Sequence, residues 1–131
     1  MAAENTLLVR SMEFAEDVDT QYLCAKQVTA VNEAGIADTA ASDVIIGVFQ
    51  NTGEDGEAAA VAMIGISKVK IGTSGVSKND FLTCESGGKA VTTTTLDNYL
   101  VGLALEAGDL NDVIPCLLMI GNTYGIGATA S

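Results

Sequence analysis

Residues 60–71 read AVAMIGISKVKI, and this stretch decides the fold class. In an extended strand, successive side chains point to opposite faces of the sheet. One face of the stretch is apolar at first and then cationic, with Ile64, Ile66, Lys68 and Lys70. The other face carries Met63, Ser67, Val69 and Ile71. We therefore expect a β-strand that starts in the core and runs out to a surface.

Seven further short apolar runs are separated by turn-forming Gly, Asn, Asp and Ser, and helical periodicity is weak. The expected strands are 6–10, 22–31, 44–50, 60–71, 81–84, 89–95, 99–105 and 113–120. This spacing predicts an all-β fold, a small β-barrel or sandwich of about eight short strands with an extended N-terminal arm. We expect residues 1–20 to form the arm, 21–121 the β-domain and 122–131 a flexible C-terminal tail.

The chain also resembles itself. Residues 43–49 (DVIIGVF) are echoed by residues 98–104 (NYLVGLA), and the Met-Ile-Gly ending at Gly65 recurs ending at Gly121. The offset from Gly47 to Gly102 is 55 residues, and the offset from Gly65 to Gly121 is 56. Two similar offsets predict two related β-modules. Because a repeat this short cannot bury its own apolar face, we expect the two halves to share one interior.

The first twenty residues allow two interpretations. An apolar, strand-like segment at 6–10 is followed by an acidic segment that contains Phe14. One interpretation is an edge strand and a solvated loop, because chain ends are usually loosely held. The other is an arm that adds a strand to a partner's sheet through backbone hydrogen bonds. The candidate partner-binding residues are Thr6, Leu7, Leu8, Val9, Arg10 and Phe14.

Composition limits the possible functions. The 131 residues fit one domain with one core, which needs no disulfide or metal. The chain has no histidine, the commonest general base and metal ligand, which argues against an enzyme. Its formal net charge of −11 disfavours direct binding to nucleic acid or anionic membranes, because both need cationic neutralisation. Eleven of the seventeen carboxylates lie in residues 1–60.

Short motifs for catalysis or metal binding are weak. Ser67 with Lys70 and Ser86 with Lys89 match the serine–lysine spacing of acyl-transfer enzymes, but both lie in an expected strand or glycine turn. The acidic run 54–57 lacks the spacing of a calcium-binding loop. We therefore expect no catalytic, cofactor-binding or metal-binding residues.

The cysteines and the N-terminus indicate the compartment. Cys24, Cys84 and Cys116 are odd in number, lack C-x-x-C spacing and lie in apolar stretches. These features predict buried free thiols made in a reducing compartment. Residues 1–5 lack the basic and apolar pattern of a signal peptide, and the apolar run 58–66 is too short to span a bilayer. We therefore expect synthesis in the cytoplasm.

A longer pattern runs from Ile71 to Cys116. It contains NDFLT at 79–83, GKAV at 88–91 and VGLALEA at 101–107, and DVIIGV at 43–48 looks like an earlier matching strand. The pattern resembles the small capsid decoration, or cement, proteins of tailed bacteriophages, over roughly residues 28–120. The acidic first twenty residues and the extension 122–131 depart from it.

The resemblance implies a non-enzymatic structural protein of the virion. It implies binding to the outer surface of the capsid, with the major capsid protein as partner and a homotrimer as the assembly. Such a protein would be made in the host cytoplasm and would stabilise the shell by bridging neighbouring capsid subunits. Two alternatives stay open: a tail-tube or spike component, and a small trimeric β-hydrolase that uses carboxylates and a metal.

Overall fold

The computed structural model describes residues 5–95 and 98–122, and within them the chain is all β, with nine strands and no helix. The strands are β1 (Asn5–Phe14), β2 (Cys24–Gln27), β3 (Glu33–Ile36), β4 (Ile45–Phe49), β5 (Ala58–Lys70), β6 (Phe81–Cys84), β7 (Ala90–Thr92), β8 (Tyr99–Ala104) and β9 (Val113–Asn122). The expected all-β class and small barrel are confirmed. The unexpected ninth strand is β3, whose four residues include Gly35 and are too few to show a pattern.

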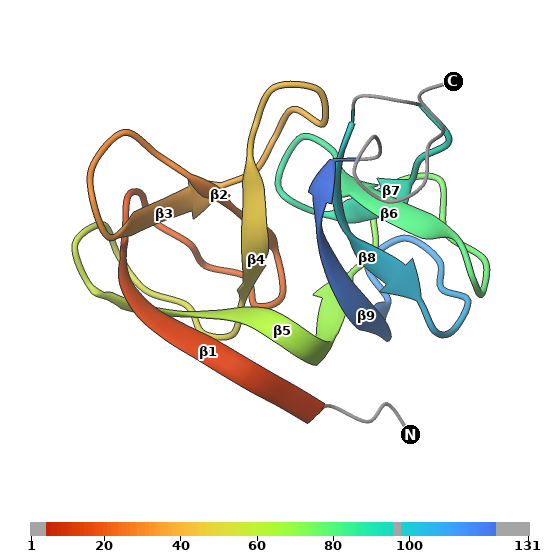
Figure 1. Ribbon diagram of the computed structural model, residues 1–131, viewed down its shortest axis with the longest axis horizontal. Coiled ribbons are helices and arrows are strands. Elements are labelled where there is room, and N and C mark those ends of the chain that lie inside the picture. Colours follow the sequence, from red (N-terminus) through yellow and green to blue (C-terminus); the bar gives the residue numbers. More distant parts are fainter. Residues whose placement is uncertain (1–4, 96–97, 123–131) are drawn as a thin grey trace.

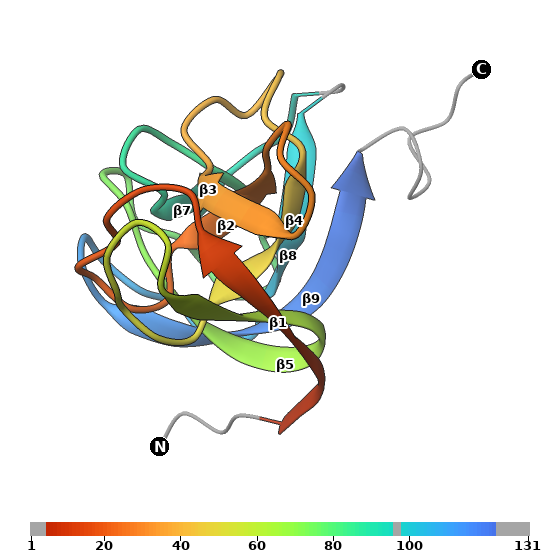
Figure 2. The same cartoon turned by 90° about the vertical axis from the view of Figure 1, so that its left-hand side faces the viewer.

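The first five strands close into a barrel, called the first module, on the left of Figure 1. Their order is β1-β3-β2-β4-β5, and β1 returns to pair with β5. β1 runs antiparallel to β5 along most of its length, and Figure 2 shows the two strands from the side of this module. β1 also pairs in parallel with β3, where Phe14 lies opposite Ala34. This parallel contact completes the ring of strands.

The second half of the chain repeats the arrangement. In this second module the C-terminal part of β5 takes the place of β1, and the hairpin β6–β7 takes that of β2–β3. β8 and β9 correspond to β4 and β5. The closing contact is a single parallel bridge between Ile71 and Ala90, the counterpart of Phe14 opposite Ala34. β5 therefore belongs to both modules.

Other paired positions follow the same repeat. Val48 lies opposite Ala62 in the first module, and Leu103 lies opposite Leu117 in the second, each pair 55 residues from its counterpart. The neighbouring Gly47 and Gly102 are therefore equivalent. The repeat predicted from these glycines is present in the strand pairing itself.

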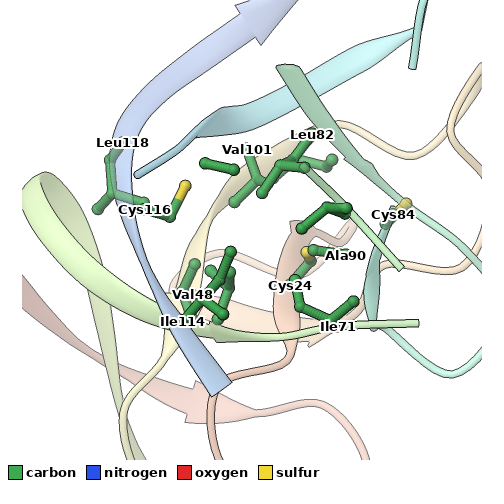
Figure 3. Close-up of a cluster of buried hydrophobic side chains, with 14 of the residues drawn as sticks. Cys24, Val48, Ile71, Leu82, Cys84, Ala90, Val101, Ile114, Cys116 and Leu118 are labelled. Atoms are coloured by element: carbon green, nitrogen blue, oxygen red, sulfur yellow. The ribbon is translucent and has the colours of Figure 1, made fainter. Parts of the chain in front are cut away.

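Two groups of buried side chains form the core. The first fills the first module and consists of Met12, Phe14, Val18, Leu23, Ala25, Ala34, Phe49, Ala59 and Val61. The second is larger, fills the second module and also includes Cys24, Ala37, Ile45, Val48 and Ala62 from the first (Figure 3). The expectation of one shared interior is thus only partly right, because each module surrounds its own group and the larger group joins the halves.

The two faces of β5 differ from the expectation in one respect. Ser67, Val69 and Ile71, which share one face, are buried. Ile64, expected at the core end of the other face, is 51% exposed. The β1–β5 pairing has two register shifts at this point, beside Gly65 with φ of +111°. Such irregularities change the direction of side chains along a strand, which moves Ile64 to the surface.

The structure describes most of the expected N-terminal arm but almost none of the expected C-terminal tail. Residues 5–14, which the sequence assigns to an N-terminal arm, form β1 of the first module. The expected tail at 122–131 lies outside the described residues, apart from the backbone of Asn122 at the end of β9. In the described part of the chain, no helix is long and apolar enough to cross a membrane.

Candidate interaction surface

All six candidate partner-binding residues lie on β1, but they do not share one environment. Leu8 and Val9 are 45% and 44% exposed, and Arg10 is also exposed. Phe14 is fully buried in the first module, with its ring centroid 5.2 Å from that of Phe49. The side chains of Thr6 and Leu7 lie outside the described part of the structure.

One edge of β1 is open. The other edge pairs with β5, whereas the open edge meets β3 only at Glu13 and Phe14. No strand of the described chain pairs with the remainder of this edge, at residues 5–12. Beside it, the Arg10 guanidinium donates a hydrogen bond to Asn32 Oδ1 at 3.2 Å. An open edge presents unpaired N–H and C=O groups that can pair with a strand of another chain.

A second exposed surface crosses the second module. It is a row of apolar side chains on β5, β9, β8 and β6, called the apolar row and made of Ile66, Leu117, Leu103 and Phe81. Each residue lies directly opposite the next, so all four point to the same side of the sheet. Phe81 is 41% exposed and Leu117 is 39% exposed, while the other two are half-buried.

The apolar row has no signal in the sequence. Its members come from four separate strands, and each strand contributes a single residue to it. The alternation in 99–105 and 113–120 marks which side chains share a face within one strand. Which residues of two strands lie opposite each other depends on how the strands pair in three dimensions, and a local sequence pattern does not determine it.

The motifs tested for chemistry have structural roles. Ser67 is fully buried, where its Oγ donates to the Lys68 carbonyl and accepts from Gln50 Nε2, both at 3.0 Å. Lys89 Nζ donates to Asn111 Oδ1 at 2.7 Å and lies in the β6–β7 hairpin. The Ser67 hydroxyl and the Lys89 ammonium are therefore each hydrogen-bonded to groups outside their serine–lysine pair.

The acidic run 54–57 forms a turn whose backbone N–H groups are bound by two carboxylates, one from the run and one from Asp17. Glu57 Oε1 accepts a hydrogen bond from the Glu54 N–H at 2.7 Å, and Asp17 Oδ1 accepts one from the Asp55 N–H at 2.9 Å. Among the described residues, no three Cys, Asp or Glu side chains gather closely enough to hold a metal ion.

Two comparisons with known proteins found a match. The family model described as phage cement protein matches residues 17–119. The crystal structure of the head fiber gp8.5 N base of bacteriophage phi29 superposes with a TM-score of 0.67. The superposition covers 86% of this chain and 93% of that chain, with 18% sequence identity, and therefore indicates a shared fold. No curated protein sequence matches.

Proposed function

This chain belongs to the phage cement protein family, and on that basis we propose that it binds the outer surface of the assembled phage head and stabilises the shell. It is a structural component of the virion. In this proposal its partners are the major capsid protein and further copies of itself, in a homotrimer that bridges neighbouring capsid subunits. It is made in the host cytoplasm and acts without catalysis. The family match over residues 17–119 is the observation that carries the proposal.

The open edge of β1 supports a contact with the capsid. Backbone groups at residues 5–12 can pair with a capsid strand, and the exposed Leu8 and Val9 add apolar area beside that edge. Strand addition of this kind takes affinity from main-chain hydrogen bonds and specificity from alternate side chains. We therefore assign the capsid contact to the exposed part of β1, without the buried Phe14.

Linked copies would strengthen the attachment. When one copy of a trimer is bound, the second and third contacts become intramolecular, so the whole assembly binds far more tightly than one copy. The net charge of −11 suits an outer coat, because like-charged particles repel one another. Both effects fit a protein that holds a pressurised shell together from outside.

Reconstitution on purified heads that lack this protein tests the proposal. The purified chain is mixed with the heads, and the amount that sediments with them is measured against concentration. We expect saturable binding at a fixed number of copies per head, and heads that retain their DNA to a higher temperature. Absence of binding, or assembly of long tubes without heads, would overturn the proposal.

A matched pair of variants locates the contact. Leu8→Asp places a carboxylate beside the open edge, and Leu110→Asp makes the same change at a 49% exposed position between β8 and β9. We expect Leu8→Asp to weaken binding about tenfold or more, equivalent to roughly 1.4 kcal/mol, and Leu110→Asp to bind as the unmodified chain does. Equal binding by the two variants would move the contact away from β1.

A further inference from the structure

A cavity of about 240 Å³ opens at one end of the first module, and it is called the end cavity. Its lining includes Met12, Ile46 and Met63, and the turn between β2 and β3 supplies Val31 and Asn32. Met12 is buried and Ile46 and Met63 are half-buried. Val31 is 91% exposed, the most exposed of the chain's large apolar side chains in the described structure. The end cavity therefore combines apolar side chains with polar ones, which include Arg10, Gln27, Thr29 and Glu33, and has an apolar side chain at its border.

The equivalent end of the second module is covered by the first module. Gly88, in the β6–β7 turn, corresponds to Asn32, and its carbonyl accepts a hydrogen bond from the Cys24 N–H at 2.7 Å. Gly88 lies so close to Ile36 and Leu23 that a side chain there would collide with Ile36. Figure 3 shows Cys24 from the first module among the buried side chains of the second.

The covering residues form a row of their own. Cys24 on β2 lies opposite Val48 on β4, which lies opposite Ala62 on β5. All three side chains are fully buried, and all three belong to the core group that joins the modules. This set is called the internal row. It is the part of the first module that faces the core of the second.

The apolar row is the counterpart of the internal row. In the second module the equivalent pairings place Phe81 opposite Leu103 and Leu103 opposite Leu117. The residues at these positions are at least as apolar as those of the internal row, yet no part of the described chain covers them fully. The described part of the chain therefore leaves a row uncovered at one end of the repeat and a cavity uncovered at the other.

From this equivalence we propose that the apolar row of one copy covers the end cavity of a second copy, as the internal row covers the second module within the chain. The inference deepens the self-association that the proposed function includes. Because the two contacting surfaces differ, the interface is heterologous, and it generates either a closed ring or an open filament. A ring of three copies would place six modules in one continuous cycle.

The two strand ends constrain the geometry of this interface. Residues 117–121 of β9 and residues 5–9 of β1 both correspond to residues 62–66 of β5. If the contact between two copies were identical to the contact between the two modules of one chain, both segments would occupy the same position. One of the two segments must therefore leave its place in the sheet when two copies join. Because shortening the N-terminus removes this overlap, it should not weaken the interface.

Molar mass in solution tests the proposal without any capsid. We expect the unmodified chain to form a defined oligomer, measured by light scattering after gel filtration. Phe81→Glu alters the apolar row, and Val31→Glu alters the border of the end cavity at a position too exposed to disturb folding. Each variant should elute as a 13.4 kDa monomer, while the control Leu110→Glu keeps the oligomer.

Mixing the two variants distinguishes this interface from a symmetric one. The Phe81→Glu chain retains an intact end cavity, and the Val31→Glu chain retains an intact apolar row. A mixture should therefore form dimers that contain one copy of each and nothing larger. A chain that lacks residues 1–9 should remain oligomeric, because its shortened β1 removes the overlap.

Three results would overturn the inference. They are a monomeric unmodified chain at all concentrations, an oligomer that both variants leave intact, and loss of the oligomer on removal of residues 1–9. A monomeric chain would also remove the homotrimer from the proposed function. Sedimentation of the chain with heads is measured separately, so failure of this inference is distinguishable from failure of the proposed capsid binding.

Discussion

Gly47 in β4 and Gly102 in β8 occupy equivalent positions in the two modules, and each allows the adjacent strand to approach closely. A Cβ atom on Gly47 would collide with the carbonyl oxygen of Ala62, and one on Gly102 would collide with that of Leu117. In both cases the obstacle is backbone of the adjacent strand, which cannot move aside without breaking the sheet. The glycines that revealed the repeat in the sequence therefore have the same physical role in both halves.

We expect Gly47→Ala and Gly102→Ala each to lower the free energy of unfolding by about 1–3 kcal/mol, the usual cost of forcing an extra carbon into a packed site. Urea unfolding followed by circular dichroism measures the change. Gly56→Asn is the control, since Gly56 has φ of +90° and open space around it, and Asn111 holds the equivalent position with φ of +69°. If Gly47→Ala lowered the free energy of unfolding by no more than Gly56→Asn does, the close approach of the neighbouring strand to Gly47 would be contradicted.

The three thiols should be protected in the folded protein. Burial raises the pKa of Cys84 to about 11 and that of Cys116 to about 12. Burial also raises the pKa of Cys24 well above its ordinary value, with further contributions from the other two thiols. The reactive species is the thiolate, so at pH 8 both ionisation and access are suppressed.

Reaction with a coloured disulfide reagent at pH 8 measures this protection. We expect no rapid reaction in the folded state and three equivalents in urea, because the chain has three cysteines and all are free. The variant Leu110→Cys supplies an exposed thiol as control and should add one rapidly reacting equivalent. Rapid reaction of the unmodified folded chain would mean that the core opens easily.

Asp43 links stability to acidic pH. Partial burial alone would raise the pKa of Asp43, but the N–H groups of Asp38 and Thr39 donate to its Oδ2 at 2.8 and 3.0 Å. The Lys26 ammonium lies 3.5 Å from the same oxygen. These three contacts outweigh burial, so the pKa of Asp43 in the folded state is lower than its ordinary value.

A lowered pKa in the folded state gives stability above the unfolded-state pKa, near pH 4, and this stability disappears as the pH falls through the folded-state pKa. We therefore expect the urea midpoint of the unmodified chain to decrease below about pH 4. Asp43→Asn should show a smaller decrease over that range. Asp19→Asn, which removes the same charge from an exposed loop position, should keep the full pH dependence.

The parts of the fold that follow from a local pattern can be predicted from the sequence. The run 81–84 was predicted with the bounds that the structure gives to β6, and the 55-residue offset between two glycines revealed the two modules. β3 was missed because a four-residue strand with a central glycine has no clear alternation. Burial of Phe14 was missed because the acidic residues around it suggest a solvated segment, whereas the ring enters the barrel at the point where β1 meets β3.

The interaction surfaces could be predicted only in part. The segment 6–10 was selected from its apolar composition, and it does include the exposed Leu8 and Val9. The end cavity and the apolar row arise from the stacking of one module on the next. The positions of the end cavity and the apolar row depend on which face of each module is covered by the other module. The sequence of a single repeat does not indicate which of its faces is left uncovered.

Phe14 provides a direct measurement of whether residues 5–14 belong to the barrel in solution. Its side chain is fully buried and packs 5.2 Å from the ring of Phe49, tilted by 36°. We expect Phe14→Ala to lower the free energy of unfolding by about 3–5 kcal/mol, as for other buried aromatic side chains. Val9→Ala on the same strand is the control. Because Val9 is 44% exposed, this substitution should lower the free energy of unfolding by less than about 1 kcal/mol. If β1 instead left the barrel as a free arm, the two variants would have similar and small effects on the urea midpoint.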